Sequence, residues 1–146
     1  MVEETSLDVF KKLLDKELVS TLTLIGKIQN SSRKFALKEE DNIALQTKII
    51  NALISWMNKQ KIKNTIVFKS GGKDKTPSLC VVVNSQDANR TVMVVGHLDK
   101  QTAEKSEWSK DLDPYDPRVK DAHLFGRGMV DGAISFISTI LMIKAF

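Results

Sequence analysis

The sequence TVMVVGHLD, residues 91–99, decides what fold to expect. From Val92 to Val95 both alternating faces are apolar, which is typical of a central strand covered by helices. His97 and Asp99 follow directly after this run. Ligands of open α/β sheets gather at the carboxyl ends of strands. The segment therefore predicts a central strand and, just beyond it, a candidate site.

The sequence before this segment predicts two helices. Apolar residues recur every three or four positions from Leu7 to Ile25, and Ser6 is the expected N-cap. A second apolar stripe ends near Lys59, and we expect Trp56 to lie in the core beneath it. Both stripes are amphipathic, so each helix should bury one side against the rest of the chain.

A β-hairpin and a last helix complete the expected fold. Residues 65–68 and 78–83 read as strands joined by a turn that contains Gly and Pro, and Cys80 is expected to be a buried, inert thiol. From Gly132 the pattern is that of a buried helix, and its apolar character continues to Phe146 without a stop signal. The elements predict an α/β domain. We expect it to be truncated, continuing beyond this chain.

Composition indicates an ordinary globular protein. The chain has 146 residues, 42% of them hydrophobic and 27% charged, and a net charge of +4. Lysines alternate with acidic residues and aromatics make up only 6%, so we expect a solvated surface and no nucleic acid. A basic nucleic-acid binder, with salt-dependent affinity, is the minor alternative. An acidic, polar N-terminus and the lack of a long apolar run predict a cytoplasmic protein without a membrane partner.

Three side chains are candidates for holding a metal. Asp99 lies two residues after His97, so on an extended segment it could accept a hydrogen bond from one imidazole nitrogen while the other binds a metal. Asp131 stands at a helix start, where partial positive charge favours a carboxylate. Each signal has an ordinary reading too. His-x-Asp can be a hydrogen-bonded pair, Asp131 a simple cap and residues 126–128 a turn, and we assign no role to His123.

The motifs together resemble one family. They are, in order, Val94-Val95-Gly96-His97-Leu98-Asp99-Lys100-Gln101, then Trp108, Pro114 and Pro117, then Leu124-Phe125-Gly126-Arg127-Gly128-Met129-Val130-Asp131. This order resembles the zinc-dependent metallopeptidases that include glutamate carboxypeptidase, acetylornithine deacetylase, succinyl-diaminopimelate desuccinylase, aminoacylase and carnosinase-type dipeptidases. The resemblance is strongest over residues 91–143.

The resemblance implies a role for each candidate residue. His97 would bind one zinc, Asp99 would orient it, and Asp131 would bridge two zincs. A water between the metals, activated by a Glu, would attack the amide bond of a dipeptide or an N-acyl amino acid. Gly96-His97-Leu98-Asp99 with Gln101 resembles the dipeptidase and carboxypeptidase branches slightly more than the deacylases. Imidazole and carboxylate ligands suit zinc, and cobalt or manganese would fit them too.

The chain also departs from the family. Asp131 is followed by Gly132-Ala133-Ile134, where family members usually carry Asp or Met and then Lys-Gly or a similar run. Thr102 stands where a Pro is usual. The resemblance implies a cis peptide bond after Asp131, a point that the sequence leaves open. The resemblance implies a Glu-Glu pair and later ligands after the last helix, and a lid and dimerisation domain. None of these can be assigned in residues 1–146. We therefore expect a partial catalytic domain, inactive by itself.

A non-catalytic remnant is the alternative. Such a fragment would act as a binding or interaction module. It would expose an unpaired sheet edge and the apolar helix over residues 134–143, and both would favour self-association.

Overall fold

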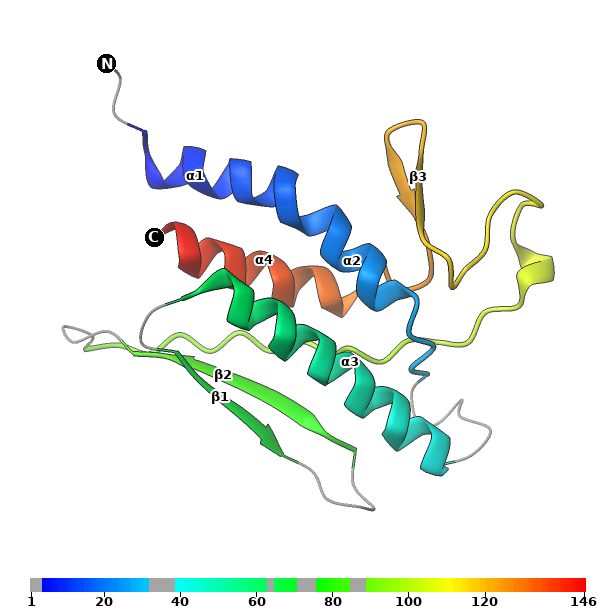
Figure 1. The fold of residues 1–146 in the computed structure, drawn as a ribbon, viewed down its shortest axis with the longest axis horizontal. Coiled ribbons are helices and arrows are strands. Elements are labelled where there is room, and N and C mark those ends of the chain that lie inside the picture. The colour runs from blue at the N-terminus through cyan, green and yellow to red at the C-terminus, as the bar shows by residue number, and fades with distance from the viewer. Residues whose placement is uncertain (1–3, 32–38, 63–64, 71–75, 85–88) are drawn as a thin grey trace.

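The computed structural model describes residues 4–31, 39–62, 65–70, 76–84 and 89–146. It is a mixed helix-and-sheet fold (Figure 1). The helical elements are α1 (Ser6–Leu13), the π-helical turn η1 (Leu14–Leu18), α2 (Val19–Gly26), α3 (Glu39–Gln60), the short 3₁₀ helix η3 (Lys105–Glu107) and α4 (Gly132–Ala145). The strands are β1 (Thr65–Ser70), β2 (Ser78–Val83), β3 (Arg118–Lys120) and β4 (His123–Phe125).

The first predicted helix is present, but its N-cap is Thr5 and not Ser6. Thr5 keeps an extended backbone, and its side chain accepts the N–H of Asp8 while the Asp8 carboxylate accepts the N–H of Thr5. This reciprocal arrangement is a capping box, which satisfies two otherwise unpaired donors. Ser6 therefore lies inside the first turn, and α1, η1 and α2 follow one another without a break.

The core lies where α4 packs against α1 and α2 on one side and α3 on the other (Figure 1). Trp56 is buried there, as predicted. The most deeply buried apolar side chains of the core come from α2, α3 and α4. They are Leu22, Ile25, Ile49, Ile50, Leu53, Ile137, Ile140 and Leu141. The prediction of a buried last helix is confirmed. The expectation that a remnant would expose residues 134–143 is wrong, because Ile137 and Leu141 have no exposed surface.

The predicted hairpin is confirmed. β1 and β2 pair antiparallel, with Thr65 opposite Val83 and Ser70 opposite Ser78. The prediction of a buried Cys80 is wrong, since its thiol is exposed. Side chains alternate along a strand. Leu79 turns toward the helices, so Cys80 faces away from them.

The predicted central strand is wrong. Residues 91–95 form no strand with any described residue, and Val92 is 87% exposed, Met93 82%, Val94 54% and Val95 76%. Within the described ranges, β2 pairs with β1 only, and the other sheet is the small β3–β4 hairpin. An apolar run is buried in a sheet only when neighbouring strands and helices cover it. Among the described residues, no strand pairs with residues 91–95 to provide that cover.

Within the described ranges, no helix combines the length and the apolar character that crossing a bilayer requires.

Candidate functional site

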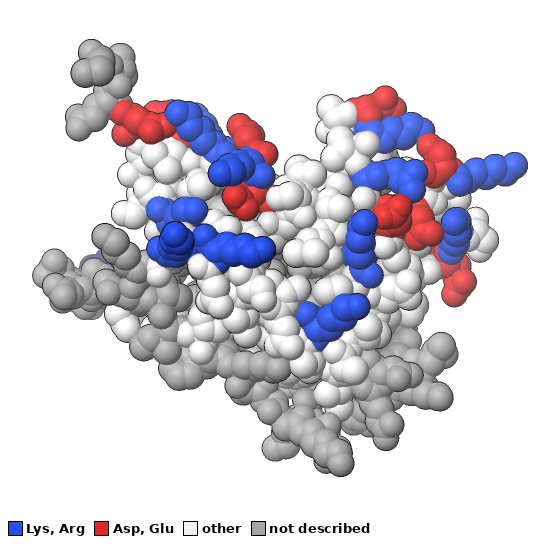
Figure 2. Space-filling view, in the orientation of Figure 1, with Lys and Arg blue, Asp and Glu red and all other residues white. Residues whose placement is uncertain are grey.

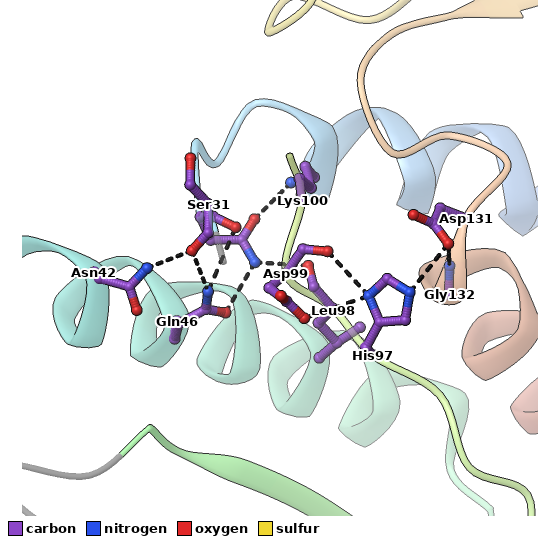
Figure 3. Close-up of polar contacts among 10 residues, drawn as sticks. Ser31, Asn42, Gln46, His97, Leu98, Asp99, Lys100, Asp131 and Gly132 are labelled. Carbon is purple, nitrogen blue, oxygen red and sulfur yellow. Dashed lines mark hydrogen bonds and ion pairs between the residues drawn. The ribbon is translucent and has the colours of Figure 1, made fainter. Parts of the chain in front are cut away.

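The three predicted site residues lie together at one end of α4 (Figure 3). Nε2 of His97 is 3.1 Å from Oδ1 of Asp131, although 34 positions separate them in the sequence. Nδ1 of His97 is 3.1 Å from the carbonyl oxygen of Asp99 and 3.3 Å from its Oδ1. All three side chains are partly exposed, so a ligand can approach them from solvent.

The hydrogen bonds decide the tautomer of His97. The carbonyl oxygen of Asp99 can only accept, so Nδ1 carries a proton and donates it. In a neutral ring, Nε2 then presents its lone pair to the Asp131 carboxylate. Two acceptors at this distance repel each other unless they share a cation. That cation can be a proton, which makes imidazolium, or a metal ion.

The electrostatic setting favours a cation at this position. Partial burial lowers the pKa of His97, but the hydrogen bond to the Asp99 carbonyl and the negative charges of Asp131 and Asp99 raise it more. The pKa therefore lies above the usual 6.5. Negative charge from both flanking carboxylates would attract a metal ion for the same reason.

Asp131 is also the N-cap of α4. Its Oδ1 accepts the N–H of Gly132 at 2.9 Å, and its backbone is extended. Asp131 is therefore a helix cap in the structure, which is the ordinary interpretation of an Asp at this position. The same oxygen faces His97, so the cap fixes where the carboxylate points. The peptide bond between Asp131 and Gly132 is trans, as are the others in the described residues.

Gly132 allows the two halves of the site to meet. A Cβ built on it would lie 2.2 Å from the carbonyl oxygen of His97 and 2.9 Å from its backbone N. No side chain fits that space. The first turn of α4 therefore touches the backbone of the His97 segment directly, and this contact brings Asp131 to the imidazole ring.

A buried polar network holds the other side of this segment (Figure 3). The side chain of Asn30, which has no exposed surface, donates to the carbonyl of Leu98 at 2.7 Å and to Oε1 of Gln46 at 3.0 Å. The backbone N–H of Lys100 donates to the Asn30 carbonyl at 2.9 Å. The carbonyl of Leu98 and the N–H of Lys100 flank Asp99, so Asn30 fixes the backbone on both sides of it.

Lys100 is the charged member of the network. Its ammonium is buried and donates to the carbonyls of Ile25 and Ile28 and to Oδ1 of Asn30, at 3.0, 2.7 and 2.7 Å. Two of these oxygens lie at the end of α2, where a cation suits the helix dipole. Burial lowers the pKa of Lys100 to about 8. The stem of Lys100 lies 3.0 Å from where a Cβ of Gly128 would be.

Sequence reasoning missed this network. Lysine and asparagine are usually read as surface or turn residues. One signal was present in α3, where Asn42, Gln46 and Gln60 share the side that carries Ile49 and Leu53. Polar residues on an apolar stripe must find partners when buried. Gln46 does so with Asn30 and with the carbonyl of Ser31, to which Asn42 also donates.

A cleft of about 360 Å³ opens beside His97. It is lined by both polar and apolar side chains, among them Asn42, Gln46, Leu79, His97, Asp99 and Phe136. Its walls come from α3, the start of β2 and α4. A small molecule in this cleft would lie against the imidazole and the Asp99 carboxylate.

Figure 2 shows the charged side chains of the described residues on one face of the molecule. Acidic and basic side chains interleave over α1 and around β3. Several form exposed pairs, such as Arg118 with Asp116 and Lys105 with Asp113. Exposed pairs of this kind contribute little to stability.

The donor set in the described residues is short of a complete metal site. Zinc in proteins takes three or four protein ligands. Among the residues that the structure describes, no group of three or more His, Cys, Asp or Glu side chains could hold a metal ion. His97 and Asp131 supply two donors of the right chemistry.

Neither a comparison of the chain with models of known protein families nor one with curated proteins finds a match.

Proposed function

We propose that His97 and Asp131 form half of a di-zinc site in a metallohydrolase that cleaves amide bonds. The observation that carries the proposal is the 3.1 Å distance between Nε2 of His97 and Oδ1 of Asp131. Two zinc bonds of about 2.0–2.1 Å at a tetrahedral angle separate their donor atoms by roughly 3.3 Å. The two side chains are thus spaced as ligands of one shared ion would be.

Asp99 acts through His97. Its carbonyl accepts a hydrogen bond from Nδ1–H and its carboxylate lies on the same side of the ring, so Nε2 keeps the lone pair for the metal. A carboxylate on a metal-bound imidazole fixes the ring and raises its basicity. The bound metal supplies Lewis acidity and lowers the pKa of water. Zinc suits these ligands, and cobalt or manganese would suit them as well.

The substrate class rests on the family resemblance. It would be a dipeptide or an N-acyl amino acid, and the cleft beside His97 offers space next to the ligands. The general base and the remaining ligands are not assigned to any residue of this chain. We therefore propose that residues 1–146 belong to a zinc-peptidase-like catalytic domain and do not turn over substrate by themselves. We also propose that the protein is cytoplasmic, where its one cysteine, Cys80, would stay reduced.

Metal binding tests the first part of the proposal. Isothermal titration of zinc into the purified chain at pH 8 should show binding that His97→Ala or Asp131→Asn weakens by about tenfold or more. Asparagine remains a good N-cap, so α4 should persist in the second variant. His123→Ala is the matched control, since this exposed histidine has its Nδ1 2.6 Å from the Asp121 carbonyl. Equal zinc affinity in all four proteins would refute the proposal.

Turnover tests the second part. The purified chain, with added zinc, cobalt or manganese, should hydrolyse neither dipeptides nor N-acyl amino acids. Metal-dependent hydrolysis that His97→Ala abolishes would show that residues 1–146 contain a complete site. That result would leave the metal ligands in place and overturn only the claim of inactivity.

An interaction fragment is the second candidate function. The observation that favours it is the exposed apolar segment from Val92 to Val95. An interaction fragment needs no metal. Zinc titration therefore distinguishes this second candidate function from the proposed metallohydrolase site.

A further inference from the structure

Residues 92–95 combine two features of an unpaired strand. The side chains on both alternating faces are exposed, from 54% at Val94 to 87% at Val92. No backbone N–H or carbonyl of these four residues makes a hydrogen bond to any described residue. An exposed, uncharged strand with a free backbone is a template for pairing with another strand.

We propose that residues 92–96 pair antiparallel with the same residues of a second copy of this chain. The charges at the two ends of the segment indicate that its partner is a second copy of the chain. Arg90 precedes it and Asp99 follows it, and the residues from Thr91 to Gly96 carry no charge. An antiparallel copy brings Arg90 of one chain toward Asp99 of the other at both ends. A parallel copy would put arginine beside arginine.

Symmetry limits the register. A closed dimer has a two-fold axis. In antiparallel strands, hydrogen-bonded and non-hydrogen-bonded pairs alternate, so the axis must pass through a residue that opposes its own copy. With Val94 at the axis, Met93 opposes Val95, and Arg90 lies one residue away from Asp99 of the other copy.

The neighbouring registers are poorer. With Met93 at the axis, Arg90 would oppose Gly96 and lie farther from the carboxylate. With Val95 at the axis, Arg90 would oppose Lys100, another cation, whose N–H already donates to the carbonyl of Asn30. The register centred on Val94 overlaps the apolar residues and leaves the network of Lys100 intact.

Sedimentation velocity over a concentration series tests the association. All runs contain EDTA, so the result does not depend on the metal proposal. The chain should form a dimer, and Val94→Lys should remain monomeric at the same concentrations, because two ammonium groups would meet at the axis. Val119→Lys is the matched control, because Val119 is 56% exposed and lies on β3, apart from the segment. Circular dichroism should show the same helix content in all three proteins.

Three outcomes would overturn the inference. They are a chain that is monomeric at every concentration, open-ended oligomers in place of a dimer, and loss of the dimer in Val119→Lys to the same extent as in Val94→Lys.

Disulfide cross-linking tests the register. In a Cys80→Ser background, Val94→Cys should form an interchain disulfide on mild oxidation, since directly opposed Cβ atoms lie about 4.5–5.5 Å apart. Val92→Cys should cross-link far more slowly, because it faces Gly96 in the proposed register. Cross-linking of Val92→Cys as fast as Val94→Cys would reject this register.

Discussion

Residues 91–95 and residues 96–100 are consecutive, yet they differ in almost every contact. Val92 and Val95 are among the most exposed apolar side chains, whereas Lys100 is only 4% exposed. The first stretch makes no backbone hydrogen bond to a described residue, while Leu98 and Lys100 are both bonded to Asn30. The apolar side chains are thus exposed and the charged one is buried. What sets the second stretch apart is its hydrogen-bond partners, for the backbone of Leu98 and Lys100 and for the ammonium of Lys100.

The largest expected effect comes from removing the charged anchor of the second stretch. Lys100→Met keeps the length of the stem but removes three charge-assisted hydrogen bonds. Oδ1 of Asn30 loses its donor, whereas the carbonyls of Ile25 and Ile28 keep backbone N–H donors. Hydrogen bonds to a charged group contribute about 1.5–3 kcal/mol each, so the free energy of unfolding should fall by about 3–5 kcal/mol. Urea unfolding measures it. Lys105→Met, at an exposed pair, is the control and should change it by less than about 0.5 kcal/mol. Equal effects of the two variants would contradict the anchoring role.

The same lysine predicts a dependence of stability on pH. Its pKa is lowered by burial from 10.5 to about 8 in the folded chain. Between these values the unfolded chain holds the proton and the folded chain does not, so the free energy of unfolding rises as pH increases through this window. At about 1.4 kcal/mol per pH unit, the rise is on the order of 3 kcal/mol.

Urea unfolding from pH 7 to pH 10 measures this rise. The Lys100→Met variant keeps all other titrating groups. The difference between the pH profiles of the unsubstituted chain and of this variant therefore gives the contribution of Lys100. Parallel profiles would mean that the ammonium is not buried as the structure has it.

Gly132 tests the contact between the second stretch and α4. Gly132→Ala places a Cβ against the backbone of His97, which cannot yield as a flexible side chain would. Overpacking of this kind costs about 1–3 kcal/mol, and it should also push Asp131 away from the imidazole. Gly96→Ala is the matched control, because a Cβ at position 96 would lie 3.4 Å from the carbonyl oxygen of Gly132, an ordinary van der Waals distance. Thermal unfolding gives the stability. The NMR signals of the His97 ring report the separation, and unshifted signals in Gly132→Ala would contradict it.

The parts of the fold that sequence predicted are those whose pattern is local. The two apolar stripes, from Leu7 to Ile25 and up to Lys59, repeat at the helical period, and Gly and Pro separate the strand-like segments in the sequence. Whether residues 92–95 are buried or exposed could not be predicted from a local pattern. It depends on which strands lie beside the segment, and an apolar run does not indicate which segments pair with it.

The candidate site divides along the same line. The motif order pointed to His97, Asp99 and Asp131, and the structure brings them together. Their roles as metal ligands remain a proposal. Nothing in the local sequence of Asn30 indicates that its side chain would bond to Leu98. A contact between positions this far apart is set by the packing of α2 and α3, which a local pattern does not contain.

The smallest expected effect tests the first stretch. Val92→Thr replaces a methyl group with a hydroxyl on a side chain that is 87% exposed, so the free energy of unfolding should change by less than about 0.5 kcal/mol. Val81→Thr is the comparison, since Val81 packs against the core from β2, and a hydroxyl placed there without a partner costs about 1–3 kcal/mol. Both are measured at concentrations low enough to keep the chain monomeric. A loss at Val92 as large as that at Val81 would mean that this stretch is buried in the folded monomer, and the difference between residues 91–95 and 96–100 would disappear.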